Sequence, residues 1–223
     1  MFLMNIILVT SIINTPQTPL SYTNIRSVYN RQERFDHMKH TIKNVKEKIP
    51  NSYVVLVECS ELSEEEKAFF YYNVDLFVNI YNNEEVREMI YSASKSYGEG
   101  MMTIHGIRSL LKQPVQWNNF FKITGRYWLS DNFNFEKYNN DYSMVKCIES
   151  DKQNVYTCLY KLNRSVLIRW YYYLQKQEKY FQECANYEII FGRFLEKIHE
   201  NKRFIKNLGI SGFVATTGDL ITA

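Results

Sequence analysis

The 223-residue sequence has few residues that interrupt regular structure, since it contains 8 glycines and 4 prolines, about half the share usual for a globular chain. This scarcity predicts long helices and strands joined by short connections. The sequence also lacks an excess of charge of one sign: 27 Lys and Arg residues and 24 Asp and Glu residues leave a formal net charge of +3. Such a balance gives no polybasic surface, so we expect no nucleic-acid partner.

The sequence also lacks paired cysteines and membrane-length apolar runs. Its four cysteines lie far apart and form no C-x-x-C pair, a pattern typical of thiols in a reducing compartment. The apolar stretch at residues 2–13 is too short to span a bilayer and has neither the cationic start nor the cleavage site of a signal peptide. These absences predict a single-domain, soluble, cytoplasmic protein with no transmembrane segment.

The first half of the chain alternates between β-branched runs and amphipathic or capped segments. We predict strands at Asn5–Ile13, Tyr53–Val57, Asp75–Ile80 and Trp117–Ile123. We predict helices at Arg31–Lys48, Ser63–Tyr72, 82–89 and Glu99–Leu111, with a loop at Ser94–Gly98 before the last of them. This alternation predicts an α/β fold of Rossmann-like type, with a mainly parallel central sheet and flanking helices.

The second half has a different pattern. Two apolar runs, Tyr142–Ile148 and Val155–Leu162, flank a polar turn and predict an antiparallel strand pair. Helices are predicted at Arg164–Tyr180 and Asn186–Ile198, and a last strand at Leu208–Val214. We therefore divide the single domain, residues 1–223, into a parallel half (1–131) and a C-terminal half (132–223).

Ligands of open α/β sheets bind beyond the carboxyl ends of the strands. Here those ends carry Thr10 and Ser11, Glu58, and the sequence Thr124-Gly125-Arg126. No G-x-G-x-x-G or G-x-x-x-x-G-K-[ST] motif occurs, which argues against standard dinucleotide binding and a P-loop. Glu58 has two interpretations: it accepts hydrogen bonds from a nucleobase or sugar, or it orders its own loop.

Cationic residues suggest an anion site at two places. Lys95 and Gly98 precede the predicted helix at Glu99, and a cation with free backbone N–H groups at a helix start suits a diphosphate. The alternative is a solvated loop lysine. Gly125 would let the backbone approach a ligand, and Arg126 offers a planar fork for phosphate. The alternative for Arg126 is an ion pair with an acid such as Glu99.

Three residues after Arg126 and one late acid complete the candidate site. Tyr127 and Trp128 have rings that stack on sugars or bases, and Asp131 can accept from hydroxyls or hold a metal. For Trp128 the alternative is core packing. Glu188 is an acid among apolar residues early in a predicted helix, which suits a general base. The alternative is a surface acid stabilised by the helix dipole.

Four segments together resemble the GT-A-fold (nucleotide-diphospho-sugar transferase) glycosyltransferases, most of all chlorella-virus-type and surface-polysaccharide-locus domains. The order and spacing of these segments carry the resemblance, which covers nearly the whole chain. The first segment runs from Arg26 to Glu58, and within it the matching residues are Arg26, Arg34-Phe35, Thr41-Ile42, Ile49–Ser52 and Val55–Glu58. The other three segments are Lys95–Glu99, Phe121–Asp131 and Tyr187–Phe191.

The resemblance implies roles for several of these residues. Thr10, Ser11 and Glu58 would hold the nucleoside of the donor, and Lys95 its diphosphate. The family usually binds Mn²⁺ or Mg²⁺ through a D-x-D motif after the fourth strand, but this sequence contains none and reads Thr124-Gly125-Arg126 there. Either Asp131 is a displaced metal ligand, or Arg126 and Lys95 replace the charge of the metal. We favour the second alternative, in which no cofactor is required.

The function implied is transfer of a sugar from a nucleotide-diphosphate-sugar donor to a hydroxyl of a glycan acceptor, as in surface-polysaccharide synthesis. Arg126 and Glu188 would be the catalytic residues, with Glu188 as the base of an inverting reaction. Tyr127, Trp128 and Asp131 would line the sugar site. The alternative is a non-catalytic nucleotide-sugar-binding or scaffold protein of the same fold.

Overall fold

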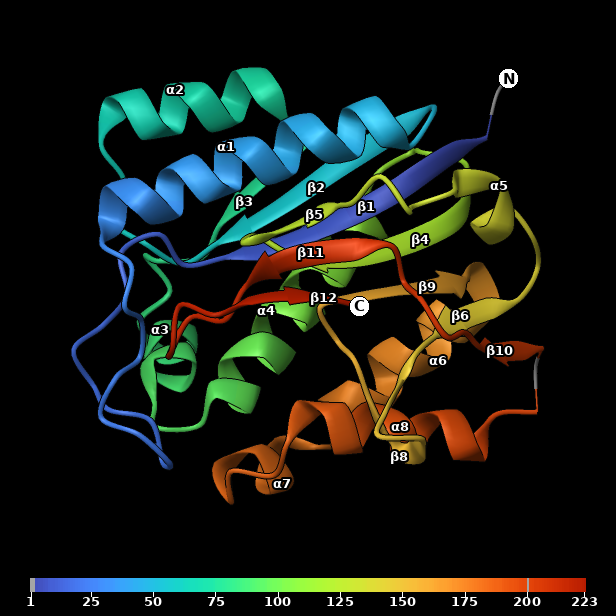
Figure 1. Cartoon of the computed structure of the whole chain (residues 1–223). Helices are drawn as coiled ribbons and strands as arrows, with labels where there is room; N and C mark the ends of the chain where they lie inside the picture. Colours follow the sequence, from blue (N-terminus) through green and yellow to red (C-terminus); the bar gives the residue numbers. More distant parts are fainter. Residues whose placement is uncertain (1–2, 200) are drawn as a thin grey trace.

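A seven-stranded sheet forms the centre of the computed structural model, which describes residues 3–199 and 201–223; Phe2, at the start of the first apolar stretch, lies outside these ranges. The strands of this sheet are β1 (Met4–Ser11), β2 (Ser52–Glu58), β3 (Leu76–Asn79), β4 (Trp117–Thr124), β6 (Ser143–Val145), β9 (Leu159–Asn163) and β10 (Lys202–Phe204). Their order is β10-β6-β9-β4-β1-β2-β3 (Figure 1), and only β9 runs antiparallel to its neighbours. The predicted mainly parallel sheet is thus confirmed.

Two smaller sheets lie beside the central one. They contain β5 (Tyr127–Leu129), β11 (Ile210–Phe213) and β12 (Leu220–Thr222) in one, and β7 (Cys147–Ile148) and β8 (Asp151–Val155) in the other. The predicted antiparallel pair is present but divided. Strand β6 pairs with β9 in the central sheet, and the residues between these two strands in the sequence form a separate hairpin of β7 and β8. Strands β5, β10 and β12 have three residues each and are too short for a periodic pattern in the sequence.

The helices largely follow the predicted segments. They are α1 (Arg31–Lys48), α2 (Glu64–Asn73), α3 (Glu84–Tyr91), α4 (Lys95–Leu110), α5 (Phe135–Tyr138), α6 (Arg164–Gln175), α7 (Glu178–Gln182) and α8 (Tyr187–Lys197). The predicted helix at Arg164–Tyr180 is interrupted between α6 and α7. The predicted loop at Ser94–Gly98 is wrong, because the Ser94 side chain accepts a hydrogen bond from the N–H of Tyr97 and thereby begins α4 at Lys95.

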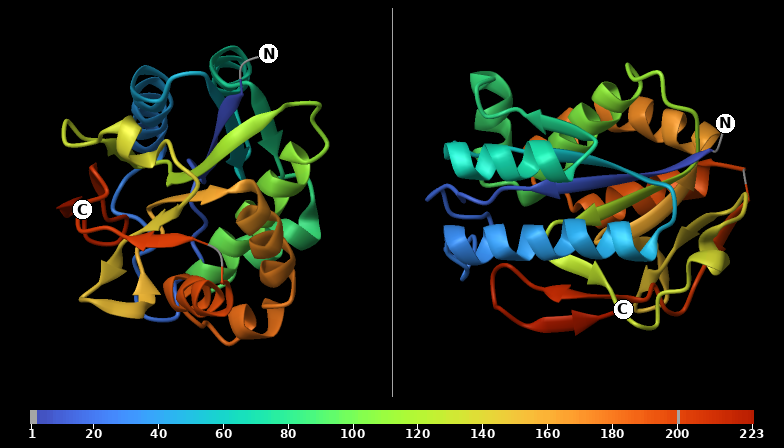
Figure 2. Two further views of the ribbon diagram at one scale, coloured as in Figure 1. Left: turned by 90° about the vertical axis from the view of Figure 1, so that its right-hand side faces the viewer. Right: turned by 90° about the horizontal axis from the view of Figure 1, so that it is seen from above.

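Helices cover both faces of the central sheet (Figures 1 and 2). Along β1, Ile7 and Val9 pack into the core formed with α1, whereas Ile6 and Leu8 pack into the core formed with α4, α6 and α8. All four side chains are at most 1% exposed. Because successive residues of a strand point to opposite faces, burial on both sides requires the continuous apolar run that the sequence shows.

The close packing of α4 on the sheet places the first turn of this helix beside the carboxyl ends of the central strands. A Cβ atom on Gly106 would lie 2.4 Å from Cδ1 of Leu8 and 2.9 Å from Cγ2 of Val57, so only glycine allows this approach. Because α4 runs against the direction of the parallel strands, its N-terminus lies at the edge where β1, β2 and β4 end. Among the described residues, no helix combines the length and apolar character needed to cross a membrane.

Candidate active site

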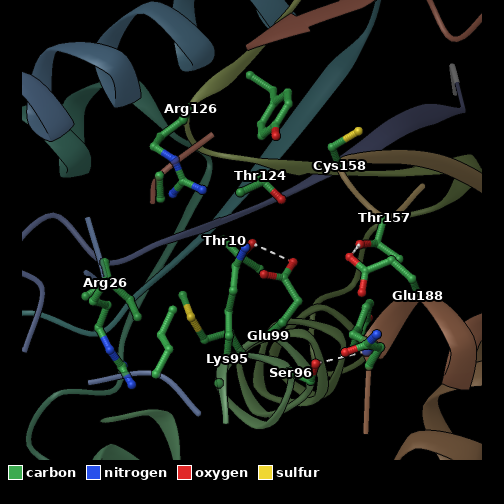
Figure 3. A pocket seen from close by; sticks show the side chains of 18 of the residues that line it. Thr10, Arg26, Lys95, Ser96, Glu99, Thr124, Arg126, Thr157, Cys158 and Glu188 are labelled. Carbon is green, nitrogen blue, oxygen red and sulfur yellow. Dashed lines mark hydrogen bonds between the residues drawn. The ribbon is translucent and has the colours of Figure 1, made fainter. Parts of the chain in front are cut away.

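A cavity of about 690 Å³ opens at the carboxyl ends of β1 and β4 (Figure 3). From β1 the chain continues to β2 on one side, while β4 lies on the other side of β1. This reversal of strand order leaves a crevice between the two strand ends, where ligands of α/β sheets bind. Thr10 and Thr124 line the crevice, and the first turns of α4 and α8 complete its walls.

Lys95 reaches into this cavity from the first residue of α4 (Figure 3). Its side chain is open to the cavity, and no hydrogen bond or ion pair within the described residues engages its ammonium group. Protein atoms nevertheless surround it, and this burial, with repulsion from Arg126, lowers the pKa of Lys95. A cation in this state is poised to gain an anionic ligand.

Arg126 enters the same cavity from the residues after β4 (Figure 3). Its backbone carbonyl accepts from the N–H of Phe213 at 3.2 Å, and its Nε donates to the carbonyl of Phe213 at 3.3 Å. Strand β11 therefore fixes the base of the side chain, while burial lowers the pKa of the guanidinium. Thus Lys95 and Arg126, 31 positions apart in the sequence, share one cavity.

Two further arginines, which the sequence analysis gave no role, also line the cavity. Arg34 is only 6% exposed, and its Nε donates to the carbonyl of Ile12 at 2.7 Å. Arg26 is fastened by backbone carbonyls near the end of α3. In the sequence, the feature that could have indicated a role for Arg34 is its place among apolar residues on the buried face of an amphipathic helix. Arg26 lies in an irregular segment without any periodic pattern.

An ion pair forms the floor of the cavity between α4 and β4. The ammonium of the fully buried Lys122 contacts the carboxylate of Glu99 and donates to Oγ1 of Thr124 at 2.8 Å. Burial raises the pKa of Glu99, but Lys122 outweighs this effect and holds the pKa below its usual range. The acid considered as a partner of Arg126 is therefore bound to Lys122 instead.

Glu188 lies on the opposite wall from Lys95 and Arg126, in the first turn of α8 (Figure 3). Its Oε1 accepts a 2.9 Å hydrogen bond from the hydroxyl of Thr157. The N–H of the preceding residue, Tyr187, donates to Oγ of Ser96 at 2.9 Å and ties the starts of α8 and α4 together. The structure thus brings the predicted base into the same cavity as the predicted cations.

Glu58 is not part of the cavity lining, although Thr10 and Ser11 are. Its carboxylate is fully buried, and Oε1 accepts from the N–H groups of Ile13 and Cys59 and from the hydroxyl of Ser60. Burial raises its pKa. The loop-ordering interpretation describes this geometry, because Glu58 ties the end of β1 to the loop after β2.

Of the residues around Arg126, the structure brings Tyr127 to the cavity but not Gly125, Trp128 or Asp131. A Cβ on Gly125 would meet Met38 and the carbonyl of Thr10, so this glycine allows close packing of protein rather than of ligand. Trp128, on the small sheet, packs against Phe213 of β11 and against His40 of α1.

Asp131 is fully exposed and pairs with Lys48 at 3.1 Å, outside the cavity. The chain turns away from the central sheet at β5, which separates these residues from the strand end. Gly98 does line the cavity, where its lack of a side chain lets α4 approach the carbonyl of Ile90.

The donor set at the strand end does not fit a divalent cation. At the position where the D-x-D motif is expected, the cavity presents Thr124 and the cationic Arg126. Among the described residues, no cluster of three or more His, Cys, Asp and Glu side chains has the arrangement of a metal site. The two cavity carboxylates, Glu99 and Glu188, are bound to Lys122 and Thr157.

Comparison with solved structures identifies the fold. No family model and no curated protein matches the sequence. The chain is similar to the Mn/GDP form of core-mannan synthase A from Aspergillus fumigatus, with a TM-score of 0.56 and 9% identity over 93% of this chain and 73% of that one. The chain has a GT-A-type fold.

Two other solved structures are similar at lower scores. A CTP:phosphocholine cytidylyltransferase from Streptococcus pneumoniae has a TM-score of 0.49 and 11% identity, over 95% of this chain and 94% of that one. An active-site mutant of LgtC has a TM-score of 0.47 and 10% identity, over 85% and 70%.

Proposed function

We propose that this protein is a glycosyltransferase that moves a sugar from a nucleoside-diphosphate-sugar to an acceptor hydroxyl. The observation that carries the proposal is the meeting of Lys95 and Arg126 in one cavity at the ends of β1 and β4 of a GT-A-type fold. The donor diphosphate would lie between these two cations. Thr10 and Ser11 would contact the nucleoside side of the donor.

Fixed cations would supply the charge that a divalent cation supplies in other enzymes of this fold. As the bond between the anomeric carbon and the phosphate oxygen breaks, negative charge grows on the leaving nucleoside diphosphate. Preorganised cations aimed at that charge stabilise the transition state without reorganising. The guanidinium of the buried Arg34, which also lines the cavity, would add to the positive charge that stabilises the leaving group. We therefore propose a reaction that requires no metal.

Glu188 would act as the base. The acceptor oxygen forms a bond to the anomeric carbon, its proton passes to the Glu188 carboxylate, and the nucleoside diphosphate leaves. Support comes from the position of Glu188 on the wall across from Lys95 and Arg126 (Figure 3). Attack from the face opposite the leaving group would invert the anomeric configuration. Glycan synthesis is the setting that we propose for this transfer.

Hydrolysis and thermal-shift assays with UDP-, GDP-, CDP- and dTDP-sugars test the proposal, each with EDTA and with Mn²⁺. We expect one nucleotide class to raise the melting temperature and to be hydrolysed slowly in EDTA. Arg126→Ala should weaken both effects strongly, and Arg164→Ala, at a site outside the cavity, should change neither. Absence of any shift with every donor would overturn the proposal. Binding without turnover would favour the non-catalytic binding module.

A further inference from the structure

An exposed tyrosine stands at the rim of the cavity. Tyr22 lines the cavity and is nevertheless 64% exposed. It lies in a tight turn closed by Leu20 and Thr23, which pair as an isolated β-bridge with a 2.9 Å hydrogen bond from the N–H of Leu20. A large aromatic ring is therefore displayed to solvent at an opening lined by both polar and apolar side chains.

The turn that carries Tyr22 is fastened to the body of the protein. The N–H of Ser21 donates to the carbonyl of Ala93 at 3.0 Å, just before α4. Arg26 donates to the carbonyl of Thr18 at 3.0 Å and to the carbonyls of Ile90 and Tyr91 at 3.4 Å. These bonds fix the backbone that carries the ring, so less conformational freedom is lost when a ligand packs on it. The turn thereby holds an exposed apolar surface at the rim of the cavity.

Residues of the C-terminal half share the cavity with Tyr22. Burial is the main cause that raises the pKa of the Tyr22 phenol, and the negative charge of the nearby Glu188 is the second. Asn154 and the half-buried Tyr156, from the arm formed by β7 and β8, also line the cavity. The N–H of Tyr156 donates to the carbonyl of Lys146 at 2.8 Å, which fixes the arm. Two tyrosine rings, an amide and a carboxylate therefore line the same opening.

This combination suits one class of acceptor. The CH face of a pyranose ring packs on an aromatic ring, while its hydroxyls find amide and carboxylate partners; tyrosine offers both an apolar face and a polar end. We propose that Tyr22 is a specificity-determining residue whose ring stacks on a sugar ring of the acceptor. The acceptor is then a saccharide. This inference rests on the proposed glycosyltransferase function.

Binding measurements can separate the two proposals. UDP, GDP, CDP and dTDP are first titrated into the wild-type protein by calorimetry, which tests the donor site alone. Saturation-transfer difference NMR then measures the binding of methyl α-mannoside, methyl β-glucoside and methyl β-galactoside in the presence of the nucleotide that binds. We expect the ring protons of at least one glycoside to be saturated. Failure of the nucleotide titration overturns the proposed function, and the acceptor inference with it.

Variants then locate the glycoside. Tyr22→Ala should weaken its binding about tenfold and raise the acceptor KM without changing nucleotide affinity, whereas Tyr22→Phe should bind it nearly as the wild type does. Tyr72→Ala is the matched control, since Tyr72 is 88% exposed on α2 and does not line the cavity. If nucleotide binds but no glycoside is saturated, or if Tyr22→Ala and Tyr72→Ala behave alike, the acceptor inference is wrong while the donor site stands.

Discussion

The hydroxyl of Thr157 donates a 2.9 Å hydrogen bond to Oε1 of Glu188, and this bond joins the segment before β9 to the first turn of α8. Thr157 is only 6% exposed, so its hydroxyl has little freedom to move. No hydrogen bond within the described residues engages Oε2 of Glu188. One carboxylate oxygen is therefore held while the other remains available to an incoming hydroxyl.

This arrangement predicts the effect of removing the base. Glu188→Gln keeps the shape of the side chain and its contact with Thr157 but cannot take a proton, so the transfer rate should fall about 10²- to 10⁴-fold. Thr157→Val should cause a smaller loss, because the carboxylate remains but is no longer oriented. Rates of product formation measure both effects, and calorimetry with the donor nucleotide should show unchanged affinity. A Glu188→Gln protein with a wild-type rate contradicts the assignment.

Lys95 predicts a pH dependence of donor binding. Burial and Arg126 lower its pKa in the free protein, whereas a bound diphosphate favours the ammonium and raises it. Affinity is therefore highest below the free-state pKa and decreases as the pH rises through the window between the two values. Calorimetry from about pH 7.5 to about pH 10 measures this decrease, in a range where the nucleotide phosphates are fully ionised.

Substitution of the same residue provides the control. Lys95→Arg retains a cation across the whole range, so its affinity should decrease less steeply with pH than that of the wild type. Lys112→Arg, at an exposed lysine just after α4, should leave the profile unchanged. Identical slopes for Lys95→Arg and the wild type would show that another group causes the dependence.

The parallel half of the fold could be predicted because its signals are local. A continuous apolar run such as Ile6–Val9 shows directly that a strand is buried on both faces. Capping residues such as Ser63 likewise mark a helix start, and α2 does begin at the next residue, with a complete capping box to Glu66. The boundary at Ser94 was missed, because the sequence Ser-Lys-Ser-Tyr-Gly looks like a turn unless the serine is known to cap.

The candidate site could be predicted only in part, because its geometry depends on contacts between distant segments. Placement at the strand ends followed from topology, and it brought Lys95 and Arg126 together. Whether Glu99 pairs with Arg126 or Lys122 depends on how α4 lies over β4, which no local pattern encodes. Asp131 is close to Arg126 in sequence, but β5 belongs to another sheet and carries it away.

The contrast between Arg126 and Asp131 is itself testable. Arg126→Ala removes a charged partner of the diphosphate and should raise the donor Kd about 10- to 100-fold. Asp131→Asn removes only an exposed pair with Lys48 and should leave the Kd unchanged, both in EDTA and with Mn²⁺. Calorimetry with the donor nucleotide measures all four conditions. A loss of Mn²⁺-dependent affinity in Asp131→Asn would instead support the displaced metal ligand.

Gly125 predicts a packing effect that is independent of any ligand. A Cβ there would lie 1.9 Å from Cε of the fully buried Met38 and 3.2 Å from the carbonyl of Thr10. Gly125→Ala should therefore lower the free energy of unfolding by about 1–3 kcal/mol, as measured by urea denaturation. Met38→Ala alone should cost about 2–5 kcal/mol through the cavity it leaves.

The double variant separates a steric clash from a general loss of packing. In Gly125→Ala/Met38→Ala the new methyl group occupies space that the methionine has vacated, so the loss of stability should be smaller than the sum of the single effects by about 1 kcal/mol. Gly125→Ala/Leu110→Ala is the control, because Leu110 packs on the other face of the sheet and its effect should simply add. Additive losses in both pairs would show that Gly125 does not owe its identity to Met38, and the close approach of α1 to the end of β4 would then need another cause.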